Sequence, residues 1–187
     1  SKPVRIGNAA AEQPQLDIYG EVMDAFFHAE IGLKKLCEED FHIWRQMIEH
    51  LRGIWMQPDE GIWETRGGRQ HFTFSKVMCW VAFDRGVKTL EKDGDDSPLC
   101  KHWRAVRGEI HAEICRSAFD PTQNTFVQAY HSTQLDASLL MLPLVGFLPH
   151  DDPRMVGTVA AIERRLLDRG LVQRYDTHET NDGLPPK

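Results

Sequence analysis

The sequence predicts an all-α protein in which inner helices alternate with outer ones. Helical periodicity recurs six times along the 187 residues, whereas the alternating pattern of strands is nearly absent. Helices that are apolar on several sides alternate with helices that carry a single apolar stripe. Short and long connections alternate as well. A toroid of paired helices requires this pattern, because its inner ring is packed on both sides and its outer ring has one face in water.

The first predicted helix, 17–29, has the weakest pattern of the six. Asp17 can act as its N-cap, because an Asp oxygen accepts hydrogen bonds from the free amides of a first turn. One face carries apolar residues, namely Ile18, Val22 and Phe26. The second helix, 38–55, is of the outer type and has one stripe of Phe41, Trp44, Ile48, Leu51 and Trp55. The third, 73–90, is apolar around most of its circumference, which predicts burial on several sides.

The fourth predicted helix, 101–118, is again one-sided, through Trp103, Val106, Ile110 and Ile114. The fifth, 137–148, is almost wholly apolar despite Pro143 and is therefore of the inner type. The sixth, 152–169, returns to one stripe, formed by Met155, Val159, Ile162 and Leu166. Gly170 is expected to end this helix as its C-cap.

Connection lengths support the same arrangement. Short links join an inner helix to the next outer one, at 91–100 and 149–151. Long links lead into inner helices, at 56–72, at 119–136 and from 171 onward. Long loops in a compact domain are usually functional, so we expect the site at the end where they emerge together. A helical solenoid with a protein-binding loop face also alternates, but no motif repeats at a period of about 30 to 50 residues.

Composition argues against several classes of function. The net charge is −6 and the pI about 5.8, with no Lys/Arg stripe, which argues against a nucleic-acid partner. The sequence has no apolar run long enough to span a membrane and no signal-peptide pattern, so we expect a cytoplasmic protein without a membrane partner. The four cysteines form no CxxC pair, which favours reduced thiols. His111 and Cys115 have a metal-compatible spacing but no second ligand pair, so we expect no metal and no cofactor.

The segment 58–76 carries most of the chemistry. An acidic turn precedes Trp63 and Glu64, and paired glycines between two arginines follow. Trp offers a flat face for a sugar ring, Glu offers a proton, and Arg offers a fork of donors for hydroxyl groups. Without further context, Glu64 also fits a carboxylate that interacts with a helix dipole or pairs with Arg66.

Further motifs accompany this segment along essentially the whole chain. In order they are Arg5-Ile-Gly-Asn8, Gln15-Leu-Asp17-Ile-Tyr-Gly-Glu21, Glu60-Gly-Ile-Trp-Glu64, His71-Phe-Thr-Phe-Ser-Lys76, Leu135-Asp-Ala-Ser138, Leu142-Pro-Leu-Val-Gly-Phe-Leu148, Arg174-Tyr175 and Asp182-Gly-Leu184. Together they resemble glycoside hydrolase family 15, the glucoamylase and trehalase family. The resemblance implies an (α/α)6 barrel, of which six helices supply about half. It therefore implies that residues 1–187 are a partial catalytic domain, truncated at both ends, whose exposed inner surface favours self-association.

The resemblance also implies roles for individual residues. Glu64 corresponds to the general acid, and Trp63 would form a wall against the sugar and favour the protonated acid. Arg174 matches a substrate-binding Arg, although a surface Arg near a helix end is the alternative. Further candidates for contacts to substrate hydroxyls are Gln15, Asp17, Arg66, His71, Lys76 and Asp136. Asp59 and Glu60 are the next acid candidates, although we expect them to form a solvated acidic turn.

The implied activity is that of an inverting, exo-acting glycoside hydrolase that cleaves α-glucosides or oligosaccharides in carbohydrate metabolism. Thr65 departs from the glucoamylase branch, which has a second Glu after the acid, and this leaves trehalase-like or other α-glucoside specificity open. No residue matches the catalytic base, for which Glu179 is a poor substitute. The base is expected beyond Lys187, so the chain alone should be inactive. The alternative is a non-catalytic α/α module that presents its rim to a partner or a glycan.

Overall fold

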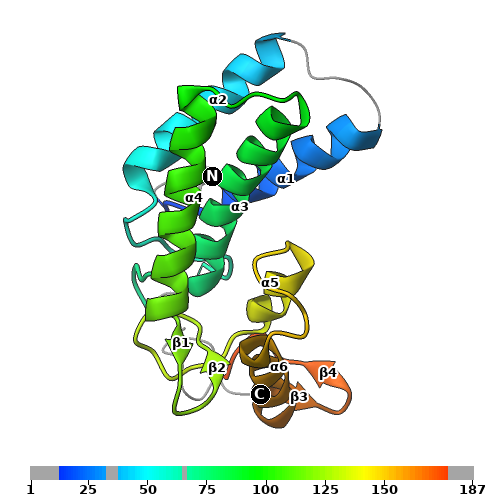
Figure 1. Cartoon of the computed structure of the whole chain (residues 1–187). Coiled ribbons are helices and arrows are strands. Elements are labelled where there is room, and N and C mark those ends of the chain that lie inside the picture. The colour runs from blue at the N-terminus through cyan, green and yellow to red at the C-terminus, as the bar shows by residue number, and fades with distance from the viewer. Residues whose placement is uncertain (1–12, 33–37, 65–66, 177–187) are drawn as a thin grey trace, which may run out of the picture.

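Within the residues that the structure describes, the protein is all-α apart from two short hairpins (Figure 1). The computed structural model describes residues 13–32, 38–64 and 67–176. The helices are α1 (Asp17–Gly32), α2 (Glu38–Ile54), α3 (Thr73–Lys92), α4 (Pro98–Ser117), the 3-10 helix η2 (Ala137–Leu140), α5 (Met141–Leu144) and α6 (Pro153–Leu166). The strands are β1 (Phe119–Asp120), β2 (Thr125–Phe126), β3 (Leu167–Asp168) and β4 (Leu171–Val172). The predicted positions of the first four helices and the sixth are confirmed within a few residues.

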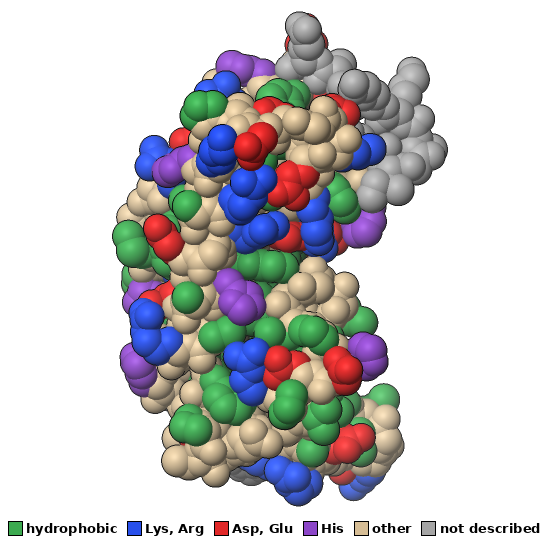
Figure 2. Space-filling model, viewed as in Figure 1, with side chains coloured by type: hydrophobic (Ala, Val, Ile, Leu, Met, Phe, Trp, Pro, Cys, Tyr) green, Lys and Arg blue, Asp and Glu red, His purple; other side chains and the backbone are tan. Residues whose placement is uncertain are grey.

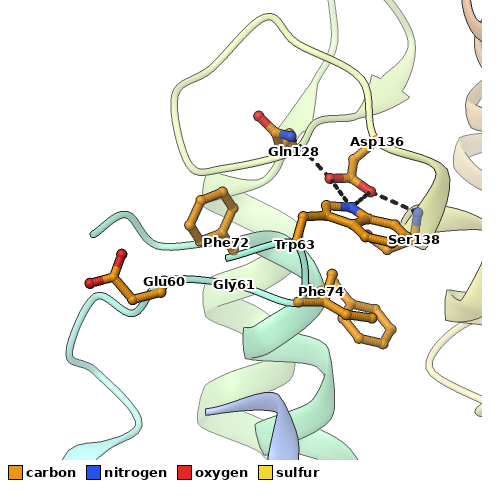
Figure 3. Close-up of a pocket in the computed structure, with 9 residues that line it drawn as sticks. Glu60, Gly61, Trp63, Phe72, Phe74, Gln128, Asp136 and Ser138 are labelled. Carbon is orange, nitrogen blue, oxygen red and sulfur yellow. Dashed lines mark hydrogen bonds between the residues drawn. The ribbon is translucent and has the colours of Figure 1, made fainter. Parts of the chain in front are cut away.

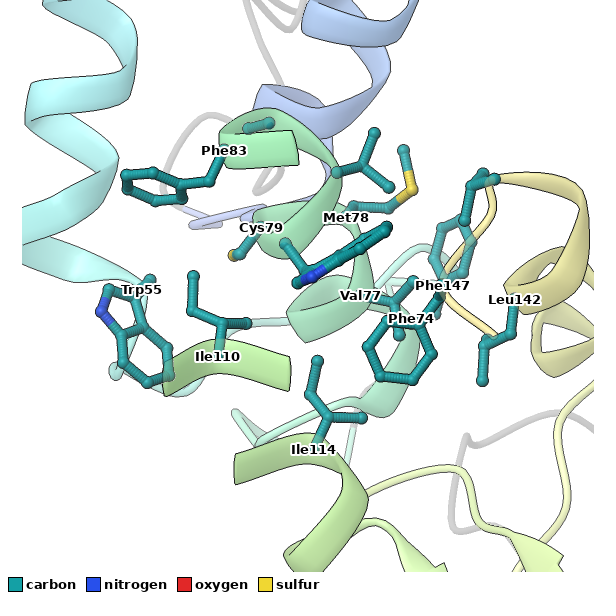
Figure 4. Packing of buried hydrophobic residues seen from close by; sticks show 14 of the residues in the cluster. Trp55, Phe74, Val77, Met78, Cys79, Phe83, Ile110, Ile114, Leu142 and Phe147 are labelled. Atoms are coloured by element: carbon teal, nitrogen blue, oxygen red, sulfur yellow. The ribbon is translucent and has the colours of Figure 1, made fainter. Parts of the chain in front are cut away.

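Helix α3 lies at the centre of the packing, between α1 and α4 (Figure 1). Between residues 73 and 90, only Lys88 is exposed, which confirms the predicted burial on several sides. Apolar side chains of α2 and α4 belong to the same buried cluster, including Trp44, Ile48 and Trp103. Ile110 and Ile114 of α4 are seen beside α3 (Figure 4). The apolar stripes predicted for α2 and α4 therefore form the core.

The predicted buried face of α1 is wrong. Ile18 and Phe26 are 48% and 38% exposed, whereas Met23 is fully buried. The reason is a close backbone contact: a Cβ added at Gly20 would lie 2.2 Å from the carbonyl oxygen of Met78 on α3. Helix α1 therefore turns Gly20 toward α3 and buries Met23, while Ile18 and Phe26 remain exposed.

The predicted fifth helix is also corrected. Residues 137–148 form the 3-10 helix η2 and then the four-residue helix α5, which ends before Gly146 adopts a positive φ of 80°. The composition is apolar, as predicted, but Met141 and Leu144 remain exposed. Pro143 lacks an amide hydrogen, so a continuous α-helix from residue 137 would lose the bond from residue 143 to the carbonyl of residue 139.

Two further predictions for the sixth helix are wrong. Helix α6 ends at Leu166, and Gly170 lies instead in the turn of the β3–β4 hairpin, where it and Arg169 have positive φ angles. Two consecutive positive φ angles suit a two-residue hairpin turn. Val159 is exposed, whereas Thr158 and the remaining stripe residues of α6 are buried.

The molecule is hollowed on one side, between α1 and the part that carries α5 and α6 (Figures 1 and 2). None of the helices in the described ranges is both long and apolar enough to cross a membrane. Cys79, Cys100 and Cys115 are free thiols, and Cys37 lies outside the described residues. Burial raises the pKa of Cys79.

Candidate functional site

Trp63 and Glu64 lie near the tip of the loop that joins α2 to α3. At the neck of this loop, Asp59 and Gln70 exchange two backbone hydrogen bonds of 2.9 Å each. The Glu64 amide donates to the carbonyl of Gly61 at 3.2 Å, and both residues have positive φ angles, 50° and 69°. A positive φ is uncommon outside glycine and costs on the order of 1–3 kcal/mol. The surroundings of the loop therefore have to hold Glu64 in this conformation.

The Glu64 side chain is exposed, and its Oε1 accepts a hydrogen bond of 3.1 Å from Nε2 of Gln15. Gln15 lies just before α1, so the start of the first helix meets the loop before the third. Glu64 precedes the start of α3 at Thr73 and is not in the first turn of a helix, which removes the helix-dipole alternative. Arg66, the other predicted partner of Glu64, lies outside the described residues.

The indole of Trp63 is held by the carboxylate of Asp136 (Figure 3). Its Nε1 donates to Oδ1 and Oδ2 at 2.9 and 3.0 Å. The same carboxylate accepts from Nε2 of Gln128 at 3.0 Å and from the amide of Ser138 at 2.8 Å. Asp136 is only 3% exposed, so in this structure its carboxylate serves Trp63 and the start of η2.

Arg174, near the end of the described chain, lies beside Trp63. The surface formed by Trp63, Glu64 and Arg174 is called the rim. Arg174 is exposed, and its Cζ lies 5.5 Å from the centre of the Trp63 ring and 5.6 Å from that of Tyr175. These distances suit cation–π contacts. The carbonyl of Arg174 accepts from the Ala137 amide at 2.8 Å, which fixes its backbone beside η2. Arg174 thus contacts the ring of Trp63, the residue before Glu64, so the long loops meet at this end of the helices.

His71 and Asp17 lie deeper than the rim. His71 is half-buried and stacks on Tyr130, with ring centres 5.6 Å apart. Burial, and then the charge of Lys76, lower the pKa of His71. Asp17 is 6% exposed, in the first turn of α1, and its Oδ1 has no hydrogen-bond partner among the described residues. Burial, and then the charge of Asp59, raise the pKa of Asp17 to about 6.

The prediction of a solvated acidic turn is wrong for Asp59, which is fully buried. Glu60 is half-buried and pairs with Arg69, with Oε1 and Nε 3.2 Å apart. Lys76 was expected at the rim but is 1% exposed. The loop folds back against the residues before α1, and this carries Asp59 inward. Sequence reasoning missed Gln128 altogether, because no motif surrounds it.

A small cavity lies beside the Trp63 side chain. Its volume is about 10 Å³, and Trp63, Phe72, Phe74, Gln128 and Asp136 are among its lining residues (Figure 3). A cavity of about this volume holds at most a single water molecule. A sugar ring does not fit there.

The fold matches that of solved carbohydrate-cleaving enzymes. The family model of glycosyl hydrolases family 15 matches residues 1–186, so the chain belongs to this family. A solved wild-type glycosidase has the same fold, with a TM-score of 0.79 and 19% identity over 92% of this chain and 46% of that chain. A glucoamylase from Saccharomycopsis fibuligera gives a TM-score of 0.66 at 13% identity, over 91% of this chain and 44% of its own. The predicted fold, about half of an (α/α)6 barrel, is confirmed.

Curated relatives are more similar in sequence. A trehalase of Mycobacterium tuberculosis is 46% identical over 184 residues, which are 98% of this chain and 27% of that protein. A trehalase of Thermoplasma acidophilum is 38% identical over 188 residues, 98% of this chain and 31% of its own length. The chain thus spans about a third or less of the curated relatives that it matches.

Proposed function

We propose that this chain is part of an inverting, exo-acting glycoside hydrolase that cleaves α-glucosidic bonds, with Glu64 as its general acid. The observation that carries the proposal is the rim itself, where Trp63, Glu64 and Arg174 lie together in a chain of family 15. Relatives named trehalases, at up to 46% identity, favour trehalose as the substrate. Residues 1–187 would then form part of the catalytic domain.

The exposed side of Trp63 is where the sugar binds. The cavity beside the indole is too small for it, and Glu64 and Arg174 are both exposed at this rim. Glu64 gives its proton to the glycosidic oxygen as the bond breaks, while Gln15 orients the carboxyl group. Arg174 donates to sugar hydroxyls. A second carboxylate, supplied by residues beyond this chain, activates the water that attacks from the opposite face.

The test uses the full-length protein that contains this chain. Trehalose, maltooligosaccharides and isomaltooligosaccharides are the substrates, and NMR identifies the first anomer released. Inversion predicts β-glucose from maltooligosaccharides and isomaltooligosaccharides. From trehalose it predicts equal amounts of β- and α-glucose, because the leaving glucose keeps its α configuration. The Glu64→Gln variant should lose roughly 100- to 10,000-fold in kcat, because it cannot protonate the leaving group.

Glu60→Gln is the matched control, since Glu60 lies in the same loop but pairs with Arg69. It should keep kcat near that of the wild type. A Glu64→Gln enzyme with undiminished activity would refute the acid assignment. Release of α-glucose from maltooligosaccharides, or of α-glucose alone from trehalose, would refute inversion. Binding of a glucoside without any hydrolysis by the full-length protein would favour the non-catalytic module.

A further inference from the structure

Asp59 is a buried carboxyl group in the loop that carries the proposed acid. We propose that Asp59 is a positioning residue. It holds the Glu64 side chain in position through the segment 14–16 just before α1. This inference rests on the proposed function of Glu64. Asp59 is fully buried and so does not touch the sugar.

Three hydrogen bonds join the segment 14–16 to the loop. The Glu60 amide donates to the carbonyl of Pro14, and the Leu16 amide donates to Oδ2 of Asp59, each at 3.1 Å. Between these two bonds, Gln15 projects its side chain to Oε1 of Glu64, also at 3.1 Å. The first two bonds therefore fix the backbone on both sides of the residue that contacts the acid.

The conformation of Glu64 explains why such a support is needed. Its positive φ of 50° is unfavourable for a residue with a Cβ. Such a conformation persists only where the surrounding contacts determine it. Within the described residues, the contacts from Gln15 and Gly61 act on Glu64 directly, and Asp59 fixes the backbone on which Gln15 lies.

The surroundings of Asp59 show that burial of its carboxyl group costs folding free energy. Burial raises its pKa, while the Leu16 amide, the Ser75 hydroxyl and Lys76 act in the opposite direction. Its Oδ1 makes no hydrogen bond of ordinary geometry in the described part of the chain. The neighbouring carboxyl of Asp17 adds like-charge repulsion. A buried apolar side chain would avoid these costs, so stability alone does not account for a carboxyl group here.

Lys76 completes the support from α3. It is 1% exposed, and its Nζ donates to the carbonyls of Trp55 and Gln57, where the loop begins. Its charge favours the ionised form of Asp59. Lys76 thus fixes the start of the loop, and Asp59 fixes its neck and the segment beside its tip.

The test compares Asp59→Ala with Asp59→Asn in the full-length protein, by kcat, KM and thermal unfolding. Alanine removes the acceptor for the Leu16 amide, so Glu64 should be displaced and kcat should fall about 10- to 100-fold. KM should change by less than about threefold, because the groups that bind the sugar remain. Asparagine keeps an acceptor oxygen and should recover most of kcat. If the alanine variant does not fold, Asp59→Ser, which is too short to reach the Leu16 amide, replaces it.

A double-mutant cycle tests whether Asp59 acts on Glu64 through Gln15. If Asp59 acts through Gln15, then adding Gln15→Ala to Asp59→Ala should lower kcat by much less than the product of the two single effects. If the double variant instead lowers kcat by the product of the two single effects, Asp59 does not act through Gln15.

Asp84→Ala is the control for a merely structural loss. Asp84 is a buried carboxylate of α3 that accepts from Arg85 and Arg107, away from the loop. This variant should unfold at a lower temperature but keep its kcat. Asp59→Ala with wild-type kcat, beside an inactive Glu64→Gln, would overturn the inference and leave the proposed function intact. An active Glu64→Gln would overturn both.

Discussion

The acidic residues of this chain differ in pKa because their surroundings differ. Asp17 is buried beside Asp59, which raises its pKa from 3.8 to about 6. Asp152 accepts hydrogen bonds from Arg154, which lower its pKa to about 2. Both residues lie at or just before the start of a helix. Burial and partners, rather than residue type or position in a helix, therefore decide their charge.

Substitution of Asp17 by Asn should make stability less dependent on pH. The folded pKa lies above the unfolded one, so the contribution of Asp17 is favourable below about pH 4 and is lost as the pH rises through about 6. An asparagine side chain at this position cannot ionise. The Asp17→Asn variant should therefore gain up to about 3 kcal/mol over the wild type at pH 8 and almost nothing at pH 4.

Urea unfolding at both pH values measures this difference. Glu109→Gln, at an exposed position of α4, is the control and should shift stability little at either pH. An equal effect of Asp17→Asn at pH 4 and pH 8 would contradict the prediction. If Asp17 also contacts the sugar, the more stable variant will bind substrate less tightly.

Trp63→Phe separates the ring of Trp63 from its hydrogen bond. Phenylalanine keeps an aromatic face toward the sugar but loses the donor to the buried Asp136. Stability should fall by about 1–3 kcal/mol, because a buried acceptor loses a partner. Trp103→Phe loses a comparable bond to Glu49 far from the rim and should leave kcat and KM unchanged. If Trp63→Phe changes neither stability nor kinetics, then Asp136 does not hold the indole.

At the scale of the elements, the close contact between α1 and α3 sets the position of Gln15. It depends on Gly20, because an added Cβ would meet the carbonyl carbon, oxygen and Cα of Met78 at 2.2–2.8 Å. Backbone atoms cannot yield as a flexible side chain can. The helix that begins just after Gln15 would have to move away from α3.

Gly20→Ala should therefore destabilise the protein by at least about 1–3 kcal/mol, the usual cost of overpacking. Gly53→Ala is the control: Gly53 is exposed on α2, with no atom within 4 Å of an added Cβ. It should stabilise the protein by about 0.5–1 kcal/mol, since alanine favours the helix. Thermal unfolding of both variants decides the matter. A neutral Gly20→Ala would show that α1 can shift freely on α3.

At the scale of the whole molecule, apolar side chains of inner-type helices remain exposed. On α1 these are Ile18 and Phe26, and on α5 they are Met141 and Leu144. Exposed apolar groups of this kind favour association. We expect the isolated 187-residue chain to self-associate and to show no hydrolysis of trehalose.

Sedimentation velocity across a concentration series tests the association. Ile18→Glu with Phe26→Glu should shift the chain toward monomer, because charged groups resist burial. Ile43→Glu, on the outer-type helix α2 at a side chain that is 55% exposed, should leave association unchanged. A wild-type chain that remains monomeric throughout would contradict the prediction. Trehalose hydrolysis by the isolated chain would show that a second carboxylate lies within it.

Periodicity in the sequence determined which segments are helices and how deeply most of them are buried. The spacing of apolar residues within one helix shows which of its faces are buried and which face water. This local information was enough for the stripes of α2 and α4 and for the all-round apolar pattern of α3. The motif around Glu64 likewise indicated the class of chemistry. The face of α1 was mispredicted because it is set by Gly20 against the backbone of α3, a contact that apolar spacing does not encode.

Only the tertiary structure decided how the candidate residues are held. Gln15 meets Glu64, and Trp63 meets Asp136, across 49 and 73 positions of the chain. Such contacts depend on how helices pack and where loops fold back, so no local pattern predicts them. Asp59 shows the difference: in the sequence it belongs to an acidic turn, and in the folded protein it is buried and anchors the segment before α1.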